Sequence, residues 1–378
     1  MRCKARNYTG SQINTGTLRQ SNIELLRIIA MVIIVAHHFA RHSGFDFPTS
    51  SISVNRLWIR FILLGGKIGV NVFVIISGYF LATSKSTKAG KILKLWLQIF
   101  FYSVVIFLGF VIAGLKPFNI KELIKHFSPV IFSQWWFAST YLVLYILSPY
   151  INRLLRTFNK RQYIGFMMLL LFGWCIIPTF TGQTLQSNAL LWFSFLYSVG
   201  AYFKLYKPET YYSAAKLISL SFAFAVLTFL SAVIFDVLGT KISVFGVHAT
   251  FFYGMQKLPI LIASVLLFVG FLKLDIRYNK IINIIASATF GVYLIHDSGY
   301  MRQLLWKTLF HNTFYEDKIL LIPYSLFVIT IVFIGCTLIE LFRIYALENN
   351  YISSVSIFSE YIDKKIVSFL DKIMDKCK

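Results

Sequence analysis

Ten long apolar runs dominate this chain and constrain its fold more than any motif does. Each run holds about 17–25 residues, the length that an α-helix needs to cross the hydrocarbon core of a bilayer. The runs cover residues 23–40, 64–83, 93–114, 136–155, 163–180, 189–206, 216–236, 254–273, 281–300 and 320–343. The composition agrees, since 57% of the residues are hydrophobic and only 14% are charged. We therefore predict an all-α membrane protein, a polytopic bundle of about ten transmembrane helices.

The basic residues follow the loops of this predicted bundle. The chain holds 37 Lys and Arg against 15 Asp and Glu, and most of the basic residues fall in alternate loops and in the two terminal segments. Because positively charged loops stay in the cytoplasm, this bias predicts that both termini are cytoplasmic. The net charge of +22 does not indicate nucleic-acid binding, because the charges lie in short loops, where they meet anionic headgroups.

Three segments make up the predicted organisation. Residues 1–22 are a basic cytoplasmic segment, and no small-residue cleavage site follows the first apolar run, so we expect an uncleaved first helix. Residues 23–345 are the transmembrane domain. Residues 346–378 are predicted to form a cytoplasmic amphipathic helix on the inner membrane surface, although a partner-binding role for it remains open. Its apolar residues recur at helical spacing: Ile362, Ile366, Phe369, Leu370, Ile373 and Cys377.

Two ionisable residues lie within the first predicted span. Arg27 and His38 are eleven residues apart, so three helical turns place them on one face, roughly 16 Å apart along the axis. Ionisable groups are costly in hydrocarbon, and those found there are usually functional. With the N-terminus in the cytoplasm, Arg27 lies near the inner surface, where its guanidinium can bind a phosphate or carboxylate. His38 lies near the outer surface, where an imidazole can act as a general base on a hydroxyl.

Simpler roles remain open for both residues. Arg27 can snorkel to lipid headgroups, and His38 can be a packed, hydrogen-bonded histidine. His37 lies about 100° around the helix from His38 and faces elsewhere. His38 and His42 have the i, i+4 spacing of metal ligands, but no strong third ligand follows nearby, so we expect no metal.

The widely separated cysteines indicate neither a disulfide framework nor a zinc site: Cys3, Cys175, Cys336 and Cys377.

Five sequence blocks resemble, in the same order, those of the acyltransferase 3 family. They are Arg27 with His38, residues 69–80, Lys91 with Lys94, residues 136–149 and residues 290–296. The second reads Gly-Val-Asn-Val-Phe-Val-Ile-Ile-Ser-Gly-Tyr-Phe, and the last reads Phe-Gly-Val-Tyr-Leu-Ile-His. The resemblance covers residues 22 to about 345, which is nearly the whole chain.

The resemblance implies an enzyme of the bacterial inner or cytoplasmic membrane. Members acylate extracytoplasmic glycans, usually with acetyl, and take the acyl group from cytoplasmic acyl-CoA. We therefore expect O-acetyltransferase activity with acetyl-CoA as co-substrate and without a tightly bound cofactor. His38 and Arg27 are then catalytic, and Arg27 also binds CoA. The expected acceptor is a glycan or lipid-linked sugar of the cell surface or an exopolysaccharide, and polysaccharide-assembly proteins are possible partners.

Other positions are expected to bind the substrates. Ser77, Trp136, Tyr145 and His296 are assigned to substrate binding, while Lys91 and Lys94 are assigned to the CoA phosphates. Simpler alternatives remain open. His296 is followed by Asp297, and the pair can either orient or tune a catalytic site or form a structural polar contact. The small residues at 77 and 78 permit close helix packing, Trp136 suits an interfacial belt, and the two lysines suit lipid headgroups.

The sequence also departs from the family. Many members have Glu where this chain has Tyr141, so a catalytic role for that carboxylate does not carry over. Phe73 stands alone where many members have two aromatic residues. The missing carboxylate leaves an inactive acyltransferase-like scaffold open as an alternative. A polysaccharide-pathway transporter or flippase is a second alternative, because it would share the ten spans and the buried polar residues. Against transport, the chain has no apparent internal symmetry.

Overall fold

The computed structural model describes residues 19–348 apart from 49 and 85–88, together with residues 350, 354, 355, 357–361 and 365. Every regular element within these residues is a helix, so the predicted all-α class is confirmed. Most of the predicted basic segment 1–22 and of the predicted amphipathic helix 346–378 lies outside the described residues. Both remain predictions.

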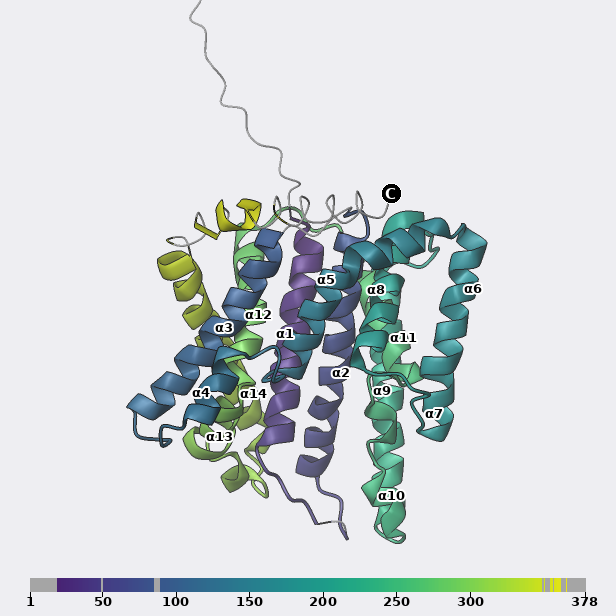
Figure 1. The fold of residues 1–378 in the computed structure, drawn as a ribbon. Helices are drawn as coiled ribbons and strands as arrows, with labels where there is room; N and C mark the ends of the chain where they lie inside the picture. The colour runs from purple at the N-terminus through teal and green to yellow at the C-terminus, as the bar shows by residue number, and fades with distance from the viewer. Residues whose placement is uncertain are drawn as a thin grey trace, which may run out of the picture.

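The long helices form a bundle in which most axes run in a common direction (Figure 1). In chain order the α-helices are α1 (Ser21–His42), α2 (Val54–Leu81), α3 (Ala89–Ile112), α4 (Ile120–Phe127), α5 (Trp136–Thr157), α6 (Lys160–Leu171), α7 (Ile177–Thr181), α8 (Ala189–Tyr206), α9 (Ala214–Gly239), α10 (Ser243–Val247), α11 (Leu258–Leu272), α12 (Lys280–His296), α13 (Gly299–Gln303) and α14 (Leu321–Phe342). A π-helical turn, Phe172–Ile176, joins α6 to α7, and another, Leu304–Leu309, follows α13.

Seven helical stretches of the described chain are long and apolar enough to cross a membrane, or eight if α12 and the bent segment after it count as one span. Nine of the ten predicted runs fall mainly on one helical stretch and the run 281–300 covers two helices, so a polytopic membrane protein is confirmed. Helices α5 and α8 are not among the seven or eight. The count of ten spans and the cytoplasmic location of both termini stay predictions.

Helix α2 begins ten residues before the predicted start of its span. The Ser53 side chain caps it by accepting a hydrogen bond from the Arg56 backbone N–H. Arg56 and Arg60 interrupt the apolar run in the sequence, but both pair with the fully buried Asp236 of α9, at 2.6 and 3.1 Å. The partner carboxylate lies 180 residues away, so the sequence alone did not reveal that these charges are compensated.

The predicted span 281–300 is not one straight helix. Helix α12 ends at His296, and the segment Gly299–Leu309 leaves it at an angle of 77°. Ser298 caps α13 by accepting a hydrogen bond from Met301 N–H, which fixes the new helix start. The bend leaves Asp297 at the turn between the two helices.

Helix α1 lies at the centre of the bundle. It packs against α2, α11, α12 and α14, and Figure 1 shows it in purple between α2 and α12. We call the end of the bundle at which α1 begins the inner end and the opposite end the outer end. The charge bias predicts that the inner end faces the cytoplasm. A polar residue on α1 is thus shielded from lipid by its neighbouring helices.

Candidate active site

Two cavities open on opposite halves of α1. The outer cavity has a volume of about 250 Å³, and the inner cavity has a volume of about 630 Å³. His38 lines the outer cavity and Arg27 lines the inner one. The two residues that the sequence placed on one face of the first span therefore face two different chambers of the same bundle.

His38 is held by a second histidine from α12. Its Nδ1 lies 2.9 Å from Nε2 of the fully buried His296, and the Nδ1 of His296 lies 2.5 Å from the carbonyl oxygen of Val292. A carbonyl can only accept, so His296 carries its proton on Nδ1 and presents a lone pair at Nε2 when the ring is neutral. Nδ1 of His38 must then donate to that lone pair.

This chain of hydrogen bonds selects one tautomer of neutral His38. With the proton on Nδ1, the Nε2 atom carries the lone pair that a general base needs. No protein group among the described residues hydrogen-bonds this Nε2. His38 is therefore oriented as a base whose reactive nitrogen has no competing partner.

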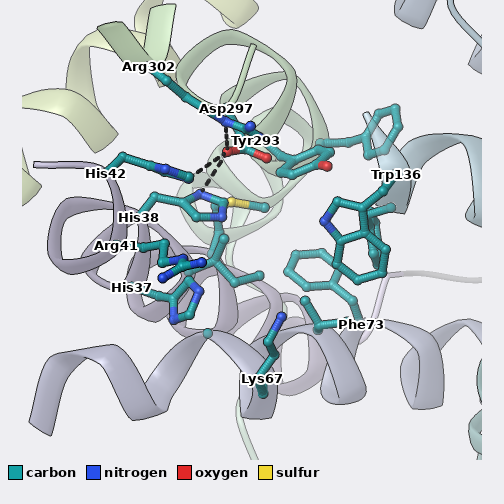
Figure 2. A pocket seen from close by; sticks show the side chains of 16 residues that line it. His37, His38, Arg41, His42, Lys67, Phe73, Trp136, Tyr293, Asp297 and Arg302 are labelled. Carbon is teal, nitrogen blue, oxygen red and sulfur yellow. Dashed lines mark hydrogen bonds and ion pairs between the residues drawn. The ribbon is translucent and has the colours of Figure 1, made fainter. Parts of the chain in front are cut away.

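Asp297 lies behind the histidines at the turn between α12 and α13 (Figure 2). Its Oδ1 is 3.5 Å from Nδ1 of His38, 3.6 Å from Nε2 of His42 and 2.7 Å from Nε of Arg302. Its Oδ2 has no hydrogen-bond partner within the described residues. A fully buried carboxylate at this position can stabilise positive charge on His38 by proximity, although His38 shares that carboxylate with Arg302 and the hydrogen bond of Nδ1 goes to His296.

Three of these residues, His38, His42 and Asp297, are candidate ligands for a metal ion. The nearest ligand atoms of His38, His42 and Asp297 lie within 4.8 Å of one another, so the bend supplies the third ligand that the sequence did not reveal. However, the Arg302 guanidinium already donates to Oδ1 of Asp297, and a cation in this position competes with a metal ion. We therefore keep the expectation of no bound metal as a prediction.

The outer cavity has an excess of positive charge. Arg41, Lys67 and Arg302 line it, whereas Asp297 is the one carboxylate among its lining residues in the described chain. The ammonium of Lys67 lies 5.5 Å from the ring centroid of Trp136, and Figure 2 shows the lysine extending from α2 towards the space between the histidines and Trp136. These cations can stabilise negative charge that develops on a bound substrate.

The inner cavity is also rich in basic residues. Arg27 donates to both carboxylate oxygens of Glu24 at 3.1 Å, and its guanidinium lies 5.4 Å from the centroid of the Phe80 ring. Lys94 forms an ion pair with Glu348 at the cavity. The other basic residues that line this cavity are Arg19, Lys280 and Arg343, and two carboxylates, Glu340 and Glu348, line it as well and pair with Arg343.

Ser77 and Tyr141 lie next to each other on the wall of the inner cavity. The Ser77 hydroxyl donates to the Phe73 carbonyl, and its oxygen is 2.9 Å from the Tyr141 hydroxyl. Since the serine proton goes to the carbonyl, Tyr141 donates to the serine oxygen. Neither contact supplies a base that would make Ser77 a nucleophile.

The remaining assigned residues divide into two groups. Trp136 lines the outer cavity and Lys94 the inner one, whereas Lys91 and Tyr145 line neither. His296, assigned to substrate binding, is fully buried behind His38 and contacts that side chain directly. The structure thus gives His296 a position from which it orients the candidate base.

Sequence reasoning missed Lys67 and Arg302 as cavity residues, and it considered His42 only as a metal ligand. Lys67 offered a signal, because it is a lone cation within the apolar stretch of α2. Arg302 gave none, because it follows the predicted span and reaches the cavity only through the bend after α12.

One comparison with known proteins is informative. A family model described as an acyltransferase domain, acyltransferase 3, matches residues 20–341. No curated protein and no solved structure gives a significant match. The matched residues contain the whole lining of the outer cavity and most of the lining of the inner one.

Proposed function

The chain belongs to the acyltransferase 3 family, and from that premise we propose that it transfers an acetyl group from acetyl-CoA to a hydroxyl of a cell-surface or exopolysaccharide sugar. The observation that carries this proposal is the pair of cavities along α1. The inner one is lined by basic residues including Arg27, and the outer one contains the oriented base His38.

The inner cavity suits the donor. Acetyl-CoA is an anion whose phosphates favour binding to arginine and lysine side chains. Arg27 is held by Glu24 in a fixed position on α1, with about a quarter of its side chain exposed. In the proposal, Arg27 and Lys94 hold the phosphate or pantetheine portion of the donor, and the thioester extends towards the outer cavity.

In the proposal, acyl transfer takes place in the outer cavity. The acceptor hydroxyl gives its proton to Nε2 of His38 while its oxygen attacks the thioester carbonyl carbon. The resulting imidazolium is stabilised by Asp297, which lies 3.5 Å from Nδ1. When the tetrahedral intermediate collapses, the carbon–sulfur bond breaks, the CoA sulfur takes the proton from His38, and the products are the acetyl ester and CoA.

Lys67 is suited to stabilise the oxyanion of this intermediate. Negative charge develops on the carbonyl oxygen as the hydroxyl attacks, and a preorganised donor at that position contributes strongly to catalysis. The lysine lines the same cavity as His38. Direct transfer is the simpler route, because the hydroxyl of Ser77 is engaged by Phe73 and Tyr141 rather than by a base.

The proposed function also specifies the membrane and the sides of it on which the two substrates lie. The enzyme acts in the bacterial inner or cytoplasmic membrane, with acyl-CoA on the inner side and a glycan or lipid-linked sugar on the outer side. Polysaccharide-assembly proteins are its expected partners.

The test is acetyl-CoA-dependent release of CoA by purified protein in detergent, with glycans extracted from the cell envelope as acceptors. We expect His38→Ala to lower kcat at least ~100-fold, the usual contribution of a general base. Arg27→Ala should raise the KM for acetyl-CoA, and Arg27→Lys should recover part of that loss. His248→Ala is the matched control, because His248 is exposed and lines neither cavity.

Two results would overturn the proposal. Wild-type turnover by a folded His38→Ala variant would remove the general base from the account. No CoA release and no acetyl-CoA binding by the wild type would instead favour a transporter or an inactive scaffold.

A further inference from the structure

Three phenylalanines line both cavities at once. Phe73 of α2, Phe137 of α5 and Phe290 of α12 are shared by the outer and the inner cavity. We call these three residues the aromatic partition. Each comes from a different helix, so the three residues lie where the two cavities adjoin.

The partition is part of a continuous cluster of rings. Phe73 and Phe137 meet at 6.4 Å between centroids, and Phe137 stacks on Tyr141 at 5.7 Å. Phe290 lies 6.3 Å from Tyr141 and 6.4 Å from Tyr293, which completes the cluster. Pairs of this kind gain only about 0.5–1.5 kcal/mol each beyond their burial.

The three phenyl side chains have no polar group to fix them. Tyr141, by contrast, is held by Ser77 at 2.9 Å. A phenyl ring therefore changes rotamer at the cost of its packing contacts, whereas a hydrogen-bonded ring must break a polar contact in addition. The aromatic partition can therefore open a path between the two cavities without the loss of a side-chain hydrogen bond.

We propose that the aromatic partition is the gate through which the acyl thioester passes, and that it selects short acyl groups. This inference rests on the proposed function, because an acyl donor in the inner cavity must reach His38 in the outer one. The partition lies across that path. An acetyl group needs little displacement of the rings, whereas each further methylene must displace one or compress it.

The size of the outer cavity adds to this selection. Its volume of about 250 Å³ must hold the acyl group together with the acceptor hydroxyl. A hydrophobic pocket discriminates by about 10–200-fold per methylene, and extra methylenes in a well-packed core are destabilising. The gate and the chamber behind it should therefore both favour acetyl over longer chains.

The experiment compares acetyl-CoA, butyryl-CoA and hexanoyl-CoA in two assays, CoA release with envelope glycans and equilibrium binding. The variants are Phe73→Ala and Phe290→Ala, with Phe73→Leu and Phe290→Leu as milder versions if an alanine variant fails to fold. Phe61→Ala is the matched control, because Phe61 is also on α2 but lines neither cavity.

We expect the wild type to prefer acetyl-CoA. In the Phe73 and Phe290 variants, the ratio of hexanoyl to acetyl kcat/KM should rise at least ~tenfold, and the binding ratio should shift in the same direction. Phe61→Ala should leave both ratios unchanged. Unchanged ratios in folded partition variants would overturn the inference.

The two assays separate this inference from the proposed function. If the wild type binds acyl-CoA without transferring it, the proposed function fails, while a shifted binding ratio in the variants still supports the partition. If the wild type binds no acyl-CoA, both proposals fail.

Discussion

At the scale of single residues, three groups determine the state of one nitrogen, Nε2 of His38. The backbone carbonyl of Val292 fixes the proton of His296, His296 fixes the tautomer of His38, and Asp297 is placed to stabilise the charge that His38 acquires in the proposed reaction. Each step follows from which atoms can donate and which can only accept. Removing the middle residue should therefore impair the base without disturbing donor binding.

His296→Ala tests this order. We expect kcat to fall about tenfold or more, but less than in His38→Ala, because His38 is then free to adopt the other tautomer. The KM for acetyl-CoA should stay near the wild-type value, since Arg27 and Lys94 are untouched. Steady-state kinetics of CoA release measure both constants.

A conservative variant completes this test. His296→Gln should recover part of the lost kcat, because an amide oxygen can accept from Nδ1 of His38. A purely structural role for His296 would instead change thermal stability together with both kinetic constants.

At the scale of helices, two glycines determine how closely α2 and α8 pack. A Cβ at Gly78 would lie 2.0 Å from the Tyr197 carbonyl oxygen, and a Cβ at Gly200 would lie 2.0 Å from the Ile75 carbonyl oxygen. Small residues permit such close backbone contact between membrane helices. The predicted packing role of the Ser77–Gly78 pair is thus supported at Gly78, which also keeps Ser77 and Phe73 in place on the same helix.

Gly78→Ala should destabilise the protein by about 1–3 kcal/mol, because the methyl group meets rigid backbone and α2 must shift away from α8. Gly109→Ala on α3 is the matched control. Its Cβ would meet nothing within 4 Å, so the alanine should be neutral or stabilising by up to about 1 kcal/mol. Thermal unfolding in detergent compares the two, and equal stability of both variants would contradict the packing argument.

The positions of the helices could be predicted from this sequence only in part. The long helices followed from apolar length alone, whereas the short helices α4 and α10 lie outside every predicted run. The early start of α2 did not follow, because Arg56 and Arg60 resemble a loop until their partner Asp236 is known. The bend at Asp297 did not follow either, because a serine cap within an apolar stretch is a weak local signal.

At the scale of the whole molecule, the candidate site could be predicted only in part. Arg27 and His38 were identified as candidates because both lie on one helix, so helical periodicity alone relates them. The contacts of His38 with His296 and Asp297 join residues about 258 positions apart, and no local pattern encodes such a distance. The aromatic partition was equally hidden, since its three rings come from α2, α5 and α12.

The arrangement of the two cavities makes the protein asymmetric across the bilayer. The donor is proposed to enter from the inner end and the acceptor from the outer end, so the reaction itself moves an acyl group across the membrane. Acyl transfer across the membrane combines the predicted cytoplasmic location of the inner end with the chemistry proposed for the site.

Reconstituted vesicles test this claim most directly. Acetyl-CoA with a radiolabelled acetyl group is supplied on the side that the inner end of the bundle faces, and envelope glycans are sealed on the opposite side. Because acetyl-CoA does not cross the bilayer unaided, we predict labelled glycan in wild-type vesicles and none in His38→Ala vesicles. Labelling only of glycans placed on the same side as acetyl-CoA would contradict transfer across the membrane.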